Sequence, residues 1–284
     1  MRAVAPASSA NLGPGFDALA LALALYVEVV VEPADRLTVT SEGEGAGLPR
    51  DATHLAAQIA TQVARHDRLR VHVKSDVPVG RGLGSSAALA VAAAAAAGAA
   101  HPLLWGHLAD GHPENAAASA LGGLVAASAG FGGPKAARLP LDPGLAFVVL
   151  VPDRELPTEL ARQALPAEVP LADAAFNISG TAMLIAALAD RSLLTPDLFE
   201  DRLHQSYRSA ALYPEAPRLL EALLNNGAIG ACWSGAGPSL LAICDGRDEA
   251  LEVRLAGERM LRAANLPGRS LLLAPDLEGV RVSP

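Results

Sequence analysis

A strand, a glycine-rich turn and an alanine-rich helix follow one another without a break between residues 71 and 97, and this succession constrains the fold most. Val71 and Val73 alternate with polar residues, as in a strand with one buried face. The turn is Pro78-Val-Gly-Arg-Gly-Leu-Gly-Ser-Ser86. The apolar run from Ala87 to Ala100 has 14 residues, fewer than the roughly 20 that cross a bilayer. We therefore expect a buried helix, over residues 87–97, rather than a membrane span.

The turn between this strand and this helix is suited to an anion. Glycines let the backbone take a positive φ and approach a ligand closely, and the first N–H groups of a helix point toward such a ligand. Ser85 and Ser86 add two hydroxyl groups. The turn lacks the Gly-Lys-Ser/Thr end of a Walker A loop, and its third glycine comes one residue too early for a dinucleotide-binding loop. On spacing alone, a phosphate site and a plain turn with a serine N-cap both stay open.

Two further motifs combine glycines with polar residues. The first, Pro6-Ala-Ser-Ser-Ala-Asn-Leu-Gly-Pro-Gly-Phe-Asp17, is predicted to be a loop and supplies the amide of Asn11 and the carboxylate of Asp17. Taken alone, both side chains are also typical of loop residues that bind nearby backbone amides. The second, Ser234-Gly-Ala-Gly-Pro-Ser239, lies between two apolar strands and by itself also fits a hairpin connection.

Apolar periodicity divides the rest of the first half into strands and a helix. Alternation from Leu19 to Val31 predicts a long strand, and residues 36–40 a partner strand. Apolar residues four apart predict a helix after residue 51, with Asp51 as its N-cap. A stretch rich in glycine and proline, residues 130–144, places the domain boundary between residues 142 and 143, giving domains 1–142 and 143–284.

The second half mixes strands and helices in a way that indicates an α+β domain rather than a doubly wound sheet. The predicted strands are 145–151, 228–232, 238–244 and 270–274, and the predicted helices are 158–164, 174–189, 197–210, 215–226 and 247–264.

Composition excludes several classes of partner. The 22 basic and 30 acidic residues give a net charge of −8, and aromatic residues make up only 4% of the chain. Nucleic acids and anionic membranes reward a basic face, and single-strand binders need aromatic stacking. Cys232 and Cys244 lie in apolar runs, as in buried thiols of a reducing compartment, and no export signal is visible. We expect a cytoplasmic protein with no nucleic-acid and no membrane partner; a homodimer stays open.

The three motifs, in this order, resemble the signature of the GHMP kinase superfamily, which includes galactokinases, homoserine kinases and mevalonate kinases. The N-terminal motif is similar to the homoserine kinase version. The resemblance extends to Gly111-His-Pro-Glu-Asn115, to Thr158 with Arg162, and to Tyr207-Arg208, so it spans nearly the whole chain. It implies an α+β two-domain fold, with an N-terminal α/β domain like domain 2 of ribosomal protein S5 and a C-terminal ferredoxin-like α+β domain.

This resemblance implies ATP-dependent phosphorylation of the hydroxyl group of L-homoserine, a step toward threonine. The ATP phosphates are then expected against the loop made by Pro78, Gly80, Arg81, Gly82, Leu83, Gly84, Ser85 and Ser86. Mg²⁺ is expected at Ser86 and at Asp110, where the family usually has glutamate; the shorter side chain either moves the metal or admits a bridging water.

Residues for the amino-acid substrate follow from the same resemblance. Asn11 and Asp17 match the positions that meet its amino end and hydroxyl group, and Arg162 and Arg208, with Thr158 nearby, match the carboxylate clamp. A planar guanidinium suits that role because it holds a carboxylate with two hydrogen bonds.

The candidate catalytic residues are Asn115, Asp17 and His112. Because an amide is not a strong base, we expect the reaction to use no dedicated base or to pass the proton to substrate or solvent. Two alternatives stay open: another small-molecule GHMP kinase, of the mevalonate or shikimate type, and a catalytically inactive binding protein with the same fold. His54 occupies a place where relatives carry asparagine near the adenine, so contacts to the base are the weakest part of the match.

Overall fold

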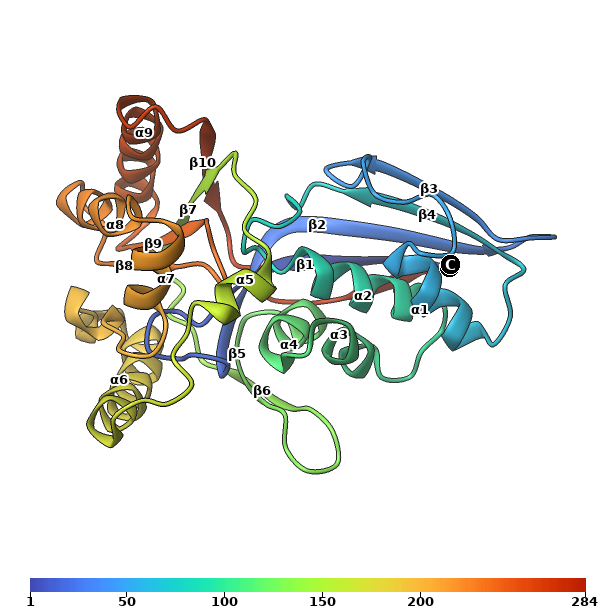
Figure 1. Cartoon of the computed structure of the whole chain (residues 1–284), viewed down its shortest axis with the longest axis horizontal. Coiled ribbons are helices and arrows are strands. Elements are labelled where there is room, and N and C mark those ends of the chain that lie inside the picture. Colours follow the sequence, from blue (N-terminus) through green and yellow to red (C-terminus); the bar gives the residue numbers. More distant parts are fainter.

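A computed structural model describes all 284 residues, and it contains two β-sheets. Figure 1 shows the larger, seven-stranded sheet with its helices gathered on one face. Its main path runs β11-β1-β2-β4-β3, and β5 and β6 extend it from β2. The bounds are β1 (Arg2–Ala10), β2 (Leu19–Pro33), β3 (Thr38–Gly43), β4 (Leu69–Ser75), β5 (Leu124–Ser128), β6 (Lys135–Leu139) and β11 (Arg281–Ser283).

The buried helix predicted after the glycine-rich turn is α2 (Ser85–Ala96), and every residue from Ala87 to Ala96 is buried. It packs against β1 and β2 on one side and against α1 (Leu55–Ala64), α3 (Pro102–Asp110) and α4 (Pro113–Leu121) on the other. Alanine is small, so these neighbours approach α2 closely from all directions. The start of α2 is thereby fixed at the end of the larger sheet that faces the smaller sheet (Figure 1).

The smaller sheet has the strand order β10-β7-β9-β8, with every neighbouring pair antiparallel. The bounds are β7 (Ala146–Pro152), β8 (Gly230–Trp233), β9 (Leu240–Cys244) and β10 (Gly268–Leu273). Helices α8 (Ala216–Asn225) and α9 (Arg247–Ala263) cover it. In chain order this is the 4-1-3-2 arrangement of a ferredoxin-like domain, so the predicted α+β class is confirmed. The boundary between residues 142 and 143 stays a prediction; β11 returns to the first sheet and pairs with β1.

Three local predictions were wrong. The expected N-terminal loop is largely β1, because Pro6 to Ala10 pair with β2 despite their weak strand propensity. Asp51 does not cap α1; the ring of His54 does, accepting from the Ala56 N–H. The single helix expected at 197–210 is a 3₁₀ turn, η2 (Pro196–Phe199), followed by α7 (Gln205–Leu212).

The break between η2 and α7 has a specific cause. The Asp201 carboxylate accepts the backbone N–H groups of Leu203, His204 and Gln205, so it starts a new helix instead of continuing the old one. The sequence patterns also missed β5, β6, α3 and α4, since short elements rich in alanine and glycine carry little periodicity.

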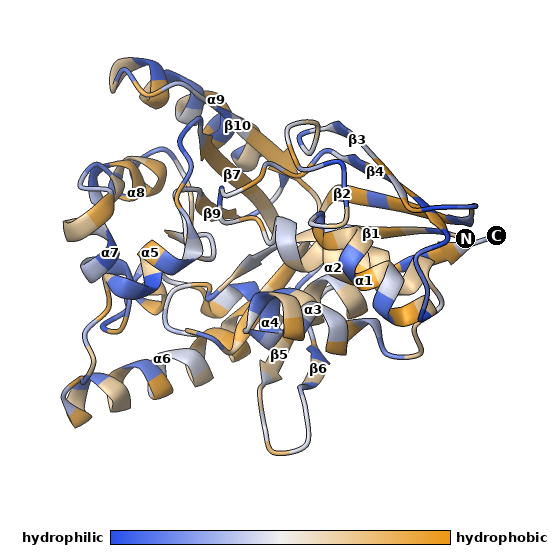
Figure 2. Ribbon diagram, turned by 45° about the vertical axis from the view of Figure 1, so that its right-hand side comes forward, coloured by the Kyte–Doolittle hydropathy of each residue, from blue (hydrophilic) through white to orange (hydrophobic).

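Helix α6 (Leu171–Ala189) lies at the periphery of the molecule, as Figure 2 shows. Its length and mean hydropathy of 1.5 would suit a membrane span by composition alone. Its inner face is polar, however. The Asn177 side chain and the Thr181 hydroxyl both donate to the carbonyl of Pro14, and Asp173 pairs with Arg202. The helix thus supports the N-terminal motif, and its outer face leaves Leu171, Ile178 and Met183 exposed.

Candidate active site

The three glycine-containing motifs meet in one cleft between the two sheets, with about 790 Å³ of space. Motifs far apart in sequence line it together with the start of α4 and with α5 (Thr158–Gln163). The lining residues include Asn11, Asp17, Gly80, Gly82, Gly84, Ser85, Ser86, Asp110, His112, Glu114, Asn115, Thr158, Arg162, Arg208 and Gly235.

The phosphate-loop candidate ends in an open helix N-terminus. Gly84, at φ 62°, is the N-cap of α2, and no side chain caps the helix. The first helical hydrogen bond is made by the N–H of Ala88 to Gly84, so the preceding N–H groups have no partner within the helix. Both serine hydroxyls also line the cleft. The plain N-cap alternative for these serines therefore fails, and the geometry is that of an anion site.

The third motif packs directly on this loop. The Ser234 hydroxyl donates to the carbonyl of Gly82 at 2.7 Å. Gly82 has φ 74°, and a Cβ atom there would lie 2.3 Å from the Ser234 carbonyl oxygen. Only glycine permits this approach, so the loop conformation depends on the other domain.

The N-terminal motif is folded tightly around Asn11. Its Oδ1 accepts the N–H of Asp17 at 3.0 Å, and its Nδ2 donates to the carbonyl of Gly235 at 2.9 Å. Asn11 and Asp17 have positive φ angles of 73° and 54°, a conformation that costs free energy in residues with a Cβ atom. The two side chains predicted to face the substrate are therefore held by their own backbone and by the third motif.

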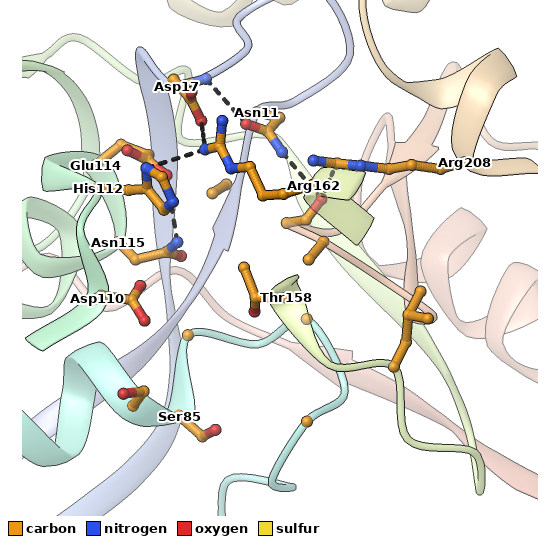
Figure 3. A pocket seen from close by; sticks show the side chains of 18 of the residues that line it. Asn11, Asp17, Ser85, Asp110, His112, Glu114, Asn115, Thr158, Arg162 and Arg208 are labelled. Carbon is orange, nitrogen blue, oxygen red and sulfur yellow. Dashed lines mark hydrogen bonds and ion pairs between the residues drawn. The ribbon is translucent and has the colours of Figure 1, made fainter. Parts of the chain in front are cut away.

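Opposite charges face each other in the upper part of the cleft. Arg162 Nη2 lies 2.5 Å from Asp17 Oδ1 and 2.9 Å from His112 Nδ1, as Figure 3 shows. Both partners of the ion pair are about a third exposed. Burial and the nearby Arg162 charge lower the pKa of His112, so its ring is neutral and accepts the hydrogen bond from the guanidinium.

The second arginine is buried. Arg208 is 2% exposed; its Nη1 donates to the Gly235 carbonyl and to His204 Nδ1, and its Nε contacts the Ala161 carbonyl. Burial and the charge of Arg162 lower its pKa to about 10, which still leaves it charged at neutral pH. The centroid of the Phe16 ring lies 5.1 Å from the Arg162 guanidinium carbon and 5.5 Å from that of Arg208, so this ring contacts both arginines.

Hard oxygen ligands lie at the opposite end of the cleft. Asp110 makes no ion pair and no side-chain hydrogen bond, and desolvation raises its pKa to about 6. It lines the same cleft as the Ser86 hydroxyl. A carboxylate without an ion-pair partner and a hydroxyl in the same cleft fit Mg²⁺, which takes one or two protein ligands together with phosphate oxygens. No cluster of three or more His, Cys, Asp or Glu side chains encloses a metal elsewhere in the chain.

A second, more apolar pocket of about 760 Å³ adjoins the cleft at Val79, Ser85 and Ser86. His54 lines it but is 1% exposed. Its Nδ1 accepts the Ala56 N–H, so in the neutral ring its Nε2 donates to the Ser41 hydroxyl, 3.1 Å away. Both ring nitrogens are occupied, which leaves van der Waals contact as the role of His54 toward a ligand here.

Most of the predicted site residues are brought together, with three exceptions. The side chains of Pro78, Arg81 and Leu83 do not line the cleft, and Leu83 is in the core. The sequence patterns missed Glu114 and His204. Glu114 is 2% exposed, its Oε2 has no hydrogen-bond partner, and burial raises its pKa to about 7. The one sequence feature that could have pointed to Glu114 is its place in the segment 111–115, which resembles a GHMP kinase motif.

Predictions outside the cleft have clear outcomes. Trp233, which precedes the third motif, is a fully buried core residue. Cys232 and Cys244 are buried free thiols, and burial raises the pKa of each to about 12. They are core residues and not nucleophiles.

Comparison with known proteins finds homoserine kinases that are similar to this chain over nearly its whole length. Residues 51–129 match the GHMP kinases N terminal domain, and residues 179–263 match GHMP kinases C terminal. The homoserine kinase of Leifsonia xyli subsp. xyli is 40% identical over 98% of this chain and 90% of its own, and that of Clavibacter michiganensis subsp. michiganensis is 42% identical over 98% and 92%. The crystal structure of homoserine kinase from Cytophaga hutchinsonii superposes with a TM-score of 0.87 at 26% identity, covering 100% of this chain and 97% of that one.

Proposed function

Because this chain belongs to the homoserine kinases of the GHMP kinase family, we propose roles for the residues of its cleft. The protein is an enzyme that transfers a phosphoryl group from ATP to the hydroxyl group of L-homoserine, a step toward threonine. The roles that follow rest on the geometry described above and on chemistry.

ATP occupies the two adjoining pockets in this proposal. The adenine enters the apolar pocket, where His54 contributes packing, and the phosphates lie on the N–H groups at the start of α2. The proposed ATP residues remain those of the turn at 78–86; for Pro78, Arg81 and Leu83 only backbone contacts apply. The shared residues Val79, Ser85 and Ser86 support this path, since they connect the two pockets.

Homoserine lies in the upper cleft, with its charged ends on opposite charges. Arg162 and Arg208 hold its carboxylate, Thr158 lies beside them, and Asp17 with Asn11 receives its ammonium group. Arg208 has one guanidinium nitrogen, Nη2, without an acceptor in the chain. The single observation that carries this assignment is that Asp17, Arg162 and Arg208 face one cleft whose lower end is the open N-terminus of α2.

The transfer itself needs positioning and charge stabilisation. The homoserine oxygen forms a bond to the γ-phosphorus, the bond from that phosphorus to the β,γ-bridging oxygen breaks, and ADP leaves. Asn115, held through its Oδ1 by the Ser8 hydroxyl at 2.8 Å, and the neutral His112 donate hydrogen bonds near the transferring group. The released proton passes to the phosphoryl group or to solvent. Ser86 and Asp110 would hold Mg²⁺, which neutralises phosphate charge when bound.

A coupled ADP-release assay tests the proposal. With Mg-ATP and equal concentrations of L-homoserine, mevalonate, shikimate and galactose, we expect turnover with homoserine at least roughly a hundredfold above the others, because only homoserine matches both charged ends. Turnover with another acceptor alone would support a different GHMP kinase. No turnover with any acceptor would support the binding-protein alternative.

Location and assembly complete the proposal. We place the enzyme in the cytoplasm, and its two free buried thiols fit a reducing compartment. A homodimer is supported by the uncharged outer face of α6, where Leu171, Ile178 and Met183 are 85%, 72% and 53% exposed. Light scattering measures the mass in solution, and a monomer at all concentrations would remove this part of the proposal.

A further inference from the structure

His204 lies at the centre of the contacts that connect the N-terminal motif to the buried arginine. The side chain is fully buried and does not line the cleft. On one side its Nε2 lies 2.8 Å from the carbonyl oxygen of Gly13. On the other, its Nδ1 lies 3.1 Å from Nη1 of Arg208. One ring therefore bridges two segments that are almost two hundred residues apart.

The two contacts determine which nitrogen of the His204 ring carries the proton. A carbonyl oxygen only accepts, so Nε2 donates to Gly13; a guanidinium only donates, so Nδ1 accepts from Arg208. Both hydrogen bonds are satisfied only by the neutral ring protonated at Nε2. Burial holds the pKa of His204 well below its usual range. The charged groups that act on it are Asp201, with its carboxylate 3.7 Å from Nε2, and Arg208 and Asp17.

Stacking adds a third contact to the same bridge. The ring of Phe16 stacks on the His204 ring, with centroids 5.1 Å apart and an interplanar angle of 23°. The other neighbours of Phe16 are the guanidinium groups of Arg162 and Arg208. A displacement of His204 would thus release both the ring that contacts the two arginines and the buried Arg208.

The backbone of His204 is itself held in place. Its N–H donates to Asp201, whose other carboxylate oxygen accepts the side chain of Asn177. Asn177 also donates to the carbonyl of Pro14. The residue next to Gly13 is therefore held by the same cluster, and the N-terminal motif cannot shift without breaking several buried hydrogen bonds.

From these contacts we propose that His204 is a positioning residue for homoserine binding: it orients Arg208 toward the substrate carboxylate and keeps the Asn11–Asp17 segment in register with it. The inference rests on the proposed function, because it takes Arg208 as a ligand of that carboxylate. His204 touches neither substrate. Its effect on the reaction passes through Arg208 and through the N-terminal motif.

Three substitutions separate the contacts of the ring. In His204→Asn, the amide oxygen takes the place of Nδ1 and retains the bond to Arg208. In His204→Gln, the amide nitrogen takes the place of Nε2 and retains the bond to Gly13. In His204→Phe, only the stacking on Phe16 remains. A matched control is His72→Phe, which removes a partly exposed histidine of β4 that is bonded to Thr40 and lies outside the cleft.

The kinetic test compares KM values for homoserine and ATP. For His204→Phe we expect the homoserine KM to rise roughly tenfold or more with the ATP KM within about twofold, since only the orientation of the carboxylate clamp is lost. The homoserine KM of His204→Asn should be closer to the wild-type value than that of His204→Gln, because asparagine keeps the contact to Arg208. The control should leave both KM values unchanged.

A double-mutant cycle distinguishes positioning from a general structural role. If His204 acts through Arg208, the loss of kcat/KM in the double variant is clearly smaller than the product of the losses in His204→Phe and Arg208→Ala. Additive losses, or equal rises in both KM values, would overturn the inference. If His204→Phe does not fold, the Asn and Gln variants decide, and equal homoserine KM values for these two overturn it as well. Failure of the proposed function looks different, since the wild-type enzyme would then not phosphorylate homoserine.

Discussion

Arg162 Nη2 lies 2.5 Å from Asp17 Oδ1, so the positive charge proposed for the carboxylate of homoserine and the negative charge proposed for its ammonium group neutralise each other. A zwitterionic substrate exchanges this one ion pair for two. A ligand with only one charged end would exchange it for one ion pair and would leave either Asp17 or Arg162 without a partner. The arrangement therefore favours substrates that carry both charges over those that carry one.

Replacing Asp17 with asparagine tests its side of this exchange. Asp17→Asn removes the charge that faces the ammonium group, and we expect the homoserine KM to rise roughly tenfold to a hundredfold while the ATP KM changes less than about threefold. A pH–rate profile tests whether Asp17 is also the catalytic base. If a clear ionisation in the wild-type profile vanished in this variant, Asp17 would be the catalytic base, and the proposal that no dedicated base is used would fail.

The buried arginine gives the second prediction. Arg208→Ala removes a guanidinium that is 2% exposed and leaves the carbonyl of Gly235 with Asn11 as its remaining side-chain donor. The homoserine KM should rise much more than the ATP KM, because this side chain makes no hydrogen bond to the phosphate loop. Arg218→Ala, on the surface of α8, is the matched control. Equal rises in both KM values for Arg208→Ala would count against its role as a carboxylate ligand.

Asp110 provides a prediction about magnesium. Asp110→Asn keeps the size of the side chain but removes its charge, and the Mg²⁺ concentration needed for half-maximal rate should rise roughly tenfold or more. Asp110→Glu restores the residue usual in the family and should keep the requirement within about threefold, since a carboxylate is retained. The measurement is the initial rate against free Mg²⁺ at fixed ATP. An unchanged requirement in the asparagine variant would remove Asp110 from the metal site.

The packing of the third motif on the phosphate loop predicts a coupled loss of stability and activity. In Gly82→Ala, the new Cβ atom would lie 2.3 Å from the Ser234 carbonyl oxygen at a φ of 74°. The left-handed conformation alone costs roughly 1–2 kcal/mol in the free energy of unfolding. Gly130→Ala, where a Cβ atom meets only ordinary contact at 3.7 Å, should cost far less. Urea unfolding measures both, and equal costs would contradict the close approach.

Local patterns predicted the motifs of the cleft, but not the contacts that hold them. The turn at 78–86 predicts a helix start, but its glycines and serines alone leave a plain N-capped turn open, and only the resemblance to the GHMP kinases favours an anion site. Nothing near His204 in the sequence indicates that its ring reaches Gly13, 191 residues away. The strand at Pro6 to Ala10 was missed for the same reason: its residues favour a loop locally, and only pairing with β2 makes them a strand.

Glu114 gives a prediction about the pH dependence of folding. Burial raises its pKa from the usual 4.5 to about 7, so between those values the folded protein binds this proton more tightly than the unfolded chain does. The free energy of unfolding is then reduced as the pH rises through this window, and the loss is complete above about pH 7. The glutamine in Glu114→Gln never ionises. Without Mg²⁺ or ATP, the free energy of unfolding of this variant relative to that of the wild type should therefore rise by roughly 1–3 kcal/mol from pH 4.5 to pH 8.

Urea unfolding at pH 4.5 and at pH 8 measures this difference between the variant and the wild type. Glu221→Gln, on the exposed face of α8, is the control and should show no gain of stability between the two pH values. The direction of the effect follows from burial, which disfavours the charged form, and Oε2 of Glu114 has no hydrogen-bond donor to offset that cost. If Glu114→Gln showed no gain at pH 8, a donor would have to reach that oxygen in solution, and Glu114 would then be ionised beside Asp17 in the substrate cleft.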